Sequence, residues 1–210
     1  MRGPNFDLRC PWRIVPMRHS SRLLSLLGCC LLAASPHFVN AQAAKPAKPA
    51  AGTMMSPSET YDKLLTGMEK EFVDVAEAMP EDKFNFAPPA SLGDFKGVRT
   101  FSGQIKHVAE ANYYFFAPAG FTEADDKAKT DAIEKLTSKA EIIAALKESF
   151  KAAHAYIATI TPENAFTMTS SGTRGGMSAF GIAHMMDHYG QMVVYLRMNG
   201  IVPPASRGSM

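Results

Sequence analysis

The chain has 210 residues, 46% of them hydrophobic, which suffices for one well-packed domain but not for two once its first segment is set aside. The formal net charge is +2, but the first 43 residues contain five arginines and one acid, which leaves 17 basic and 19 acidic residues elsewhere. A slightly acidic domain lacks the clustered basic residues that neutralise phosphates, so we expect no nucleic-acid partner.

Residues 1–43 are typical of a leader that directs export. A basic start at Arg18 and Arg22 precedes an apolar run over 23–34 and small residues suited to cleavage over 39–43. The run is too short to span a bilayer as a mature helix. We therefore expect a cleavable signal peptide, a periplasmic or extracellular protein, and membrane contact through the leader only.

Two other interpretations of the leader are weaker. A buried N-terminal helix conflicts with Pro36 and with the basic flank. Lipid attachment at Cys29 conflicts with the apolar run, which continues beyond that cysteine. Because Cys10, Cys29 and Cys30 are the chain's three cysteines, the mature domain has no disulfide and no thiol nucleophile.

The rest of the chain divides into a linker, a helical domain and a short tail. Residues 44–55 are rich in Ala, Lys and Pro, which favours a flexible linker. Residues 56–204 are expected to fold, and residues 205–210 form the tail. Apolar residues recur at three- and four-residue steps in four segments of this domain, which predict helices over about 56–79, 100–116, 138–161 and 178–198.

No segment alternates apolar and polar residues in the manner of a strand, so no sheet is predicted. Ser56 with Glu59, and Ser138 with Glu141, have the spacing of capping boxes and mark two of the helix starts. The stretch between residues 120 and 138 is charged and carries no predicted helix. We expect an all-α domain, a four-helix bundle whose helices bury their apolar stripes against one another.

The last predicted helix carries an unusual polar stripe on an otherwise apolar surface. Its members fall within an arc of about 100°: His184, Asp187, His188, Gln191 and Tyr195. Burying so many polar groups is costly unless each has a partner. Because His184 and His188 stand one turn apart, both rings can reach a single metal ion.

A third ligand should come from another helix, and His107 is the histidine inside the 100–116 segment. Taken alone, His107 is better explained as an ordinary hydrogen-bonded residue of the core or surface. His154 borders an apolar stripe without a partner at ligand spacing, so we interpret it as structural or as a support to the ligands. Glu110, one turn beyond His107, is a candidate general base or fourth ligand, and is explained at least as well as a solvated carboxylate on the helix face. Asp187 could orient a histidine or accept a proton, although an Asp beside a His on a helix more often faces a neighbouring donor.

Three neutral imidazoles leave a divalent ion its charge and at least one open position, which is typical of catalytic sites. Imidazole ligation suits Zn, Ni, Fe or Cu. Zinc is the first expectation for the cofactor, with nickel, iron or manganese as alternatives.

The chain resembles the DinB-like superfamily of metalloenzymes, which is also described through its YfiT-type members. The matching segments are residues 84–88, 100–101, 106–109, 184–191 and 195–204, within a resemblance that spans about 58–204. The resemblance implies a four-helix bundle, often dimeric, with a metal held by one histidine of the second helix and two of the last. Those positions are His107, His184 and His188 in this chain.

The resemblance also implies a range of activities. Members transfer sulfur groups from low-molecular-weight thiols or isomerise thiol conjugates, and many have no established reaction. Small thiols are largely cytoplasmic, so an exported member fits a metal-dependent hydrolase as well as a transferase acting on a small molecule. The alternative is a non-catalytic bundle that binds a metal or a partner, and a metal ion without an adjoining pocket would favour that alternative.

Overall fold

The computed structural model describes residues 48–208. The predicted signal peptide (1–43), the first part of the linker and the last two residues of the tail lie outside the described residues. Within residues 48–208 the chain forms five α-helices and no strand, apart from one isolated bridge between Met168 and Thr173. The all-α prediction is thus confirmed for this part of the chain. None of these helices is both long enough and apolar enough to cross a membrane.

The four predicted helices are all present, and the structure adds another. The helices are α1 (Pro57–Ala78), α2 (Phe101–Phe115), α3 (Glu123–Glu134), α4 (Lys139–Ile157) and α5 (Arg174–Met198), with single-turn 3-10 helices at Glu81–Lys83, Ala90–Leu92 and Pro204–Ser206. Both predicted capping boxes form, at Ser56 before α1 and at Ser138 before α4. Local sequence signals therefore set these two helix starts.

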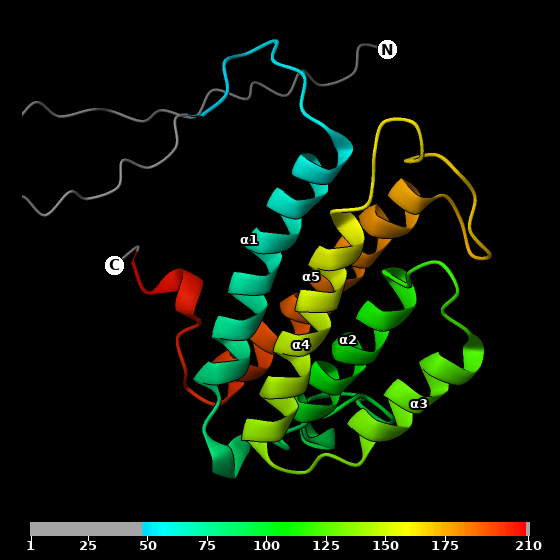
Figure 1. The fold of residues 1–210 in the computed structure, drawn as a ribbon. Coiled ribbons are helices and arrows are strands. Elements are labelled where there is room, and N and C mark those ends of the chain that lie inside the picture. Colours follow the sequence, from blue (N-terminus) through cyan, green and yellow to red (C-terminus); the bar gives the residue numbers. More distant parts are fainter. Residues whose placement is uncertain (1–47, 209–210) are drawn as a thin grey trace, which may run out of the picture. The chain divides into compact units, whose positions relative to one another are not determined.

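Four of the helices pack around one core. The helices α4 and α5 each contact both α1 and α2, while α3 packs against the outside of α2 (Figure 1). The core contains large, fully buried side chains from all four packed helices, including Phe72, Phe101, Phe150 and Met185. Because α2 and α5 contact each other, residues about 80 positions apart in the sequence can share one site.

The helix α3 is the element that the sequence patterns did not indicate. Thr122 caps it in a capping box with Asp125, and the acidic residues of its first turn favour a helix N-terminus. Only Ile133 of this helix is buried, so the apolar stripe that identified the other helices is missing.

The helix α5 begins one turn earlier than predicted. The Thr173 side chain accepts a hydrogen bond from the Gly176 backbone and caps the helix at that point. A Cβ atom at Gly175 would lie 2.9 Å from Oη of Tyr61 and 3.1 Å from the Ala165 carbonyl oxygen. Gly175, which has no side chain, thus allows α5 to approach α1 closely.

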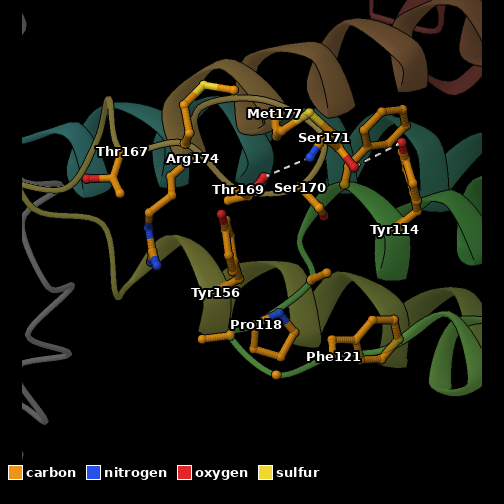
Figure 2. Close-up of a pocket in the computed structure, with 15 residues that line it drawn as sticks. Tyr114, Pro118, Phe121, Tyr156, Thr167, Thr169, Ser170, Ser171, Arg174 and Met177 are labelled. Atoms are coloured by element: carbon orange, nitrogen blue, oxygen red, sulfur yellow. Dashed lines mark hydrogen bonds between the residues drawn. The ribbon is translucent and has the colours of Figure 1, made fainter.

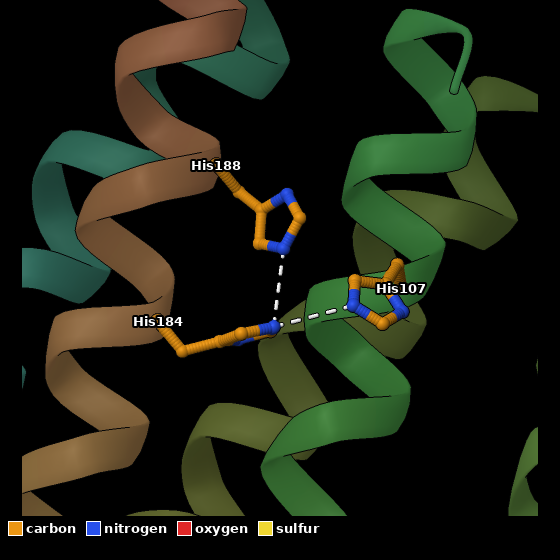
Figure 3. A group of neighbouring side chains, drawn as sticks. All are labelled: His107, His184 and His188. Carbon is orange, nitrogen blue, oxygen red and sulfur yellow. Dashed lines mark hydrogen bonds between the residues drawn. The ribbon is translucent and has the colours of Figure 1, made fainter. Parts of the chain in front are cut away.

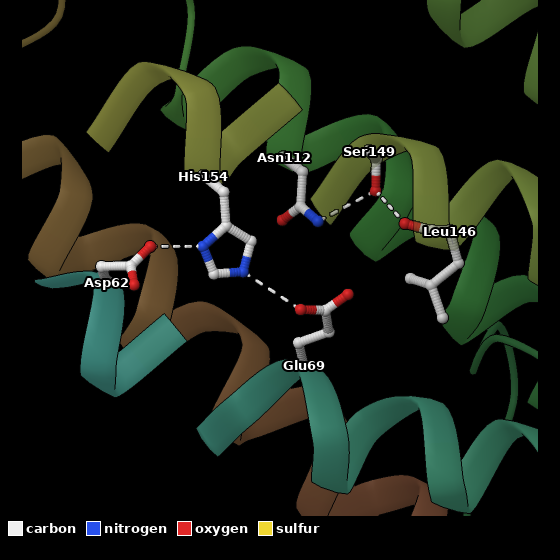
Figure 4. A network of polar contacts seen from close by, with 6 residues as sticks. All are labelled: Asp62, Glu69, Asn112, Leu146, Ser149 and His154. Carbon is white, nitrogen blue, oxygen red and sulfur yellow. Dashed lines mark hydrogen bonds and ion pairs between the residues drawn. The ribbon is translucent and has the colours of Figure 1, made fainter. Parts of the chain in front are cut away.

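Figure 4 shows polar contacts that join helices of the bundle. His154 of α4 lies between two carboxylates of α1, with Nδ1 2.6 Å from Oδ1 of Asp62 and Nε2 3.0 Å from Oε2 of Glu69. Asn112 of α2 donates a buried hydrogen bond of 3.0 Å to Oγ of Ser149 in α4. His154 therefore connects two helices, as its structural interpretation requires.

Candidate metal centre

Three histidines from two helices converge on one point (Figure 3). Nε2 of His184 lies 3.2 Å from Nε2 of His107 and 3.1 Å from Nε2 of His188. The ligand atoms of the three residues all lie within 4.8 Å of one another. His184 and His188 share a face of α5 because they are one turn apart, and that face meets α2 at His107. The structure thus brings the three candidate ligands together.

The spacing of these nitrogens fits a shared metal ion. Two nitrogens that each lie about 2.0–2.1 Å from one ion are separated by about 2.9–3.4 Å in octahedral to tetrahedral geometry. Two of the three nitrogen pairs, at 3.1 and 3.2 Å, fall in that range, and the ligand atoms of all three residues lie within 4.8 Å of one another. Hydrogen bonds alone do not explain the arrangement. Nε2 of His184 carries either one proton or one lone pair, but it faces the Nε2 atoms of both His107 and His188. The donor set therefore fits a divalent transition metal.

The surroundings keep the three rings neutral. Burial, assisted by the positive charge of Arg99 and by His184, lowers the pKa of His107 to about 4. Burial and the two neighbouring histidines lower the pKa of His188 to about 4. Burial also lowers the pKa of His184, against the opposing charge of Asp187. Neutral imidazoles are the form that binds metals.

The side-chain amide of Gln104 contacts the ring of His188 at Nδ1, the nitrogen that does not face the other histidines. Oε1 of Gln104 lies 2.5 Å from Nδ1 of His188, and Gln104 is 2% exposed. Gln104 in turn donates to Gln191, which donates to Asp187. The sequence patterns did not indicate Gln104, although a glutamine among the buried apolar residues of α2 was an available signal.

A cavity of about 270 Å³ lies beside the histidines. Its lining residues are His107, Glu110, Ala111, Tyr114, Phe115, Asp126, Thr130 and His184, from α2, α3 and α5. Oε1 of Glu110 is buried without a hydrogen-bond partner. Burial, followed by the charge of Glu134, raises the pKa of Glu110 to about 7. Asp187 is exposed and does not line this cavity.

Figure 2 shows a second cavity, of about 340 Å³. Tyr114 and Phe115 line both cavities. Oη of Tyr114 donates a 3.3 Å hydrogen bond to Oγ of Ser171, and the Phe115 ring lies 5.1 Å from the ring of His184. These two aromatic residues therefore stand between the histidines and a larger space formed by the loops that flank α2 and α5.

The fold and the site define a class of protein: a helical bundle with a three-histidine cluster that suits a metal ion. The family model of the DinB superfamily matches residues 64–192, more than half of the chain and a range that includes all three histidines. The chain belongs to the DinB superfamily. The comparison with curated proteins found no match.

Proposed function

We propose that the protein is an exported metalloenzyme, a hydrolase or a transferase that acts on a small molecule. His107, His184 and His188 hold one divalent metal ion, zinc in the first instance. The observation that carries this proposal is the cavity beside the histidines, since a bundle that only stores metal has no need of space next to its ligands. A substrate atom can approach the centre from that side.

The metal ion and the residues around it have separate roles in the proposed reaction. When bound, the ion acts as a Lewis acid that lowers the pKa of a water molecule or polarises a substrate carbonyl or sulfur. Glu110 is the group placed to give or take a proton in the same cavity, because Oε1 is unpartnered and its pKa is raised to about 7. Phe115 packs against the ring of His184, and both residues line this cavity.

The export part of the proposal rests on the leader sequence. An exported location favours hydrolysis over transfer from cytoplasmic thiols. Expression of the full chain and of a variant without residues 1–43, followed by cell fractionation, tests it. The full chain should appear outside the cytoplasm with its leader removed, and equal cytoplasmic retention of both would contradict export.

Metal analysis combined with turnover tests the enzymatic part. Plasma mass spectrometry of the purified mature chain should find one metal ion per chain, and His188→Ala should lose it. The matched control is His154→Ala, because that histidine contacts α1 and not the cluster; it should keep the metal. Turnover of a panel of esters, amides and thiol conjugates should disappear with the metal. Unchanged turnover after metal removal would refute the proposal.

A further inference from the structure

A chain of three hydrogen bonds leads from an exposed carboxylate to a buried ring of the histidine cluster. Nε2 of Gln191 donates to Oδ2 of Asp187 at 3.1 Å. Nε2 of Gln104 donates to Oε1 of Gln191 at 2.8 Å. Nδ1 of His188 lies 2.5 Å from Oε1 of Gln104. The chain passes from α5 to α2 and back to α5, and every contact in it joins side chains.

The carboxylate of Asp187, where these hydrogen bonds begin, fixes which side chain donates and which accepts in each of them. An ionised carboxylate only accepts hydrogen bonds, so the Gln191 amide must turn its NH2 group toward Asp187. The Gln191 oxygen then faces Gln104, which must donate with its own NH2 group. The Gln104 oxygen is left facing His188, so Nδ1 of that ring must carry the proton. Nε2 of His188 therefore has a free lone pair on the side of the cluster.

We propose that Asp187, acting through Gln191 and Gln104, selects the tautomer of His188 that can bind metal. The three residues are positioning residues, since none of them lines the cavity beside the histidines. This inference rests on the proposed metal site, because the tautomer matters where Nε2 of His188 is a ligand.

Reversal of the Gln104 amide would move the proton on the His188 ring from Nδ1 to Nε2. If the Gln104 amide turned over, its NH2 group would face His188 and Nδ1 would become an acceptor. The proton would then sit on Nε2 and point at His184, whose Nε2 lies 3.1 Å away. Metal binding would have to expel that proton and reverse the whole chain. Loss of such support behind a ligand typically weakens metal binding about 10- to 100-fold.

The charge of Asp187 could also act on the cluster through space, and a double-mutant cycle separates the two effects. Asp187→Asn removes both the charge and the strict acceptor. Gln191→Met keeps the charge but interrupts the chain. If these three hydrogen bonds act on His188 as a relay, either change should lower the zinc affinity by about the same factor. The two changes combined should cause no further loss. A through-space effect predicts that Gln191→Met is harmless, which would overturn the inference.

A second double variant should restore the metal-binding tautomer of His188 by reversing the direction of the hydrogen bonds. In Gln104→Glu combined with Asp187→Asn, the new carboxylate accepts from Nδ1 of His188 and from the Gln191 amide. The Gln191 oxygen then faces the new amide at position 187, which can donate. Zinc affinity should therefore recover relative to Asp187→Asn alone, whereas failure to recover in a folded double variant would count against the relay.

Two measurements on the mature protein give the result. Competition with a chromophoric chelator measures zinc affinity, and proton–nitrogen correlation NMR of the histidine rings reports the tautomer of His188 without metal. Nδ1 should carry the proton in the wild type, and a mixture should appear in Asp187→Asn. The matched control is Glu148→Gln, an exposed carboxylate of α4 paired with Lys151, which should change neither quantity.

The two readouts separate the inference from the proposed function. If the wild type binds no zinc but His188 carries its proton on Nδ1, the metal proposal fails and the relay stands. If the proton resides on Nε2 in the metal-free wild type, the relay is wrong whether or not zinc binds.

Discussion

His184 is the residue on which the contacts of the cluster converge. Its Nε2 atom faces both other histidines, and its ring packs against Phe115. Its Nδ1 atom is buried without a hydrogen-bond partner. His184 thus depends on its neighbours for position more than His188 does, since Gln104 holds the latter ring from behind.

Glu110→Gln tests the proton-carrying role at the residue scale. The amide keeps the size of the side chain but cannot exchange a proton, so kcat should fall by about 10²–10⁴-fold while metal content stays unchanged. The companion variant is Glu134→Gln. It removes a charge that raises the pKa of Glu110, so the pH–rate profile should move to lower pH. Full activity in Glu110→Gln would assign proton transfer to another group.

The three histidines also predict a pH dependence of stability for the metal-free protein. The unfolded chain takes up protons at ordinary histidines near pH 6.5, whereas the fold keeps His107 and His188 neutral until their lowered pKa values of about 4. The free energy of unfolding should therefore fall as the pH drops from about 6.5 to about 4. Urea denaturation at several pH values in this window measures this fall. A variant with both histidines changed to glutamine should show a weaker dependence of the unfolding free energy on pH.

The sequence indicated the histidines, and also Asp187 and Gln191 of the polar stripe, but not Gln104, which contacts His188 directly. Two histidines one turn apart on an apolar helix favour a shared ligand, and the structure brings them together with His107. Gln104 supports His188 from another helix, and the pairing of helices is a tertiary property that a periodic pattern does not contain. Tyr195, a member of the polar stripe, likewise bonds the Arg99 carbonyl oxygen across a loop.

At the element scale, helices with both a cap and an apolar stripe were predictable. Both signals were present for α1 and α4, and their starts agree with the predicted caps. The helix α3 has the cap alone, because a helix that covers an outer surface buries little. Its attachment to α2 relies on Ile133 and on contacts such as the 2.8 Å hydrogen bond from Lys106 to the Glu134 carbonyl oxygen.

The cap of α4 gives a stability prediction. Ser138→Ala removes the side-chain oxygen that accepts from the Glu141 backbone, so the free energy of unfolding should fall by about 1 kcal/mol. Ser91→Ala is the control, because Ser91 is exposed and lies outside the α-helices. Chemical denaturation compares the two, and equal stability of both variants would contradict the importance of this cap.

The weak attachment of α3 gives a prediction about local motion. Amide hydrogen exchange in Glu123–Glu134 should be faster than in the bundle helices, since only one of its side chains is buried. Ile133→Ala should accelerate exchange in α3 with little change elsewhere. Ile143→Ala removes the same side chain from α4 and should instead lower the stability of the whole domain. Equal protection of α3 and α4 in the wild type would be inconsistent with this picture.

At the scale of the whole molecule, the contact between α2 and α5 builds the cluster. The unfolded chain separates His107 from His184 by 77 positions, so a metal that needs all three rings binds the folded state alone. Zinc at a hundredfold excess over its Kd should therefore stabilise the domain by about 2.7 kcal/mol. Thermal unfolding with and without zinc measures the effect, and His107→Ala should abolish it.

The position of the bound metal tests the central claim most directly. Crystals of the mature protein grown with zinc should show one strong anomalous peak, located about 2.0–2.1 Å from Nε2 of His107, His184 and His188. A peak elsewhere on the domain, or zinc bound by fewer than these three rings, would contradict the proposed centre.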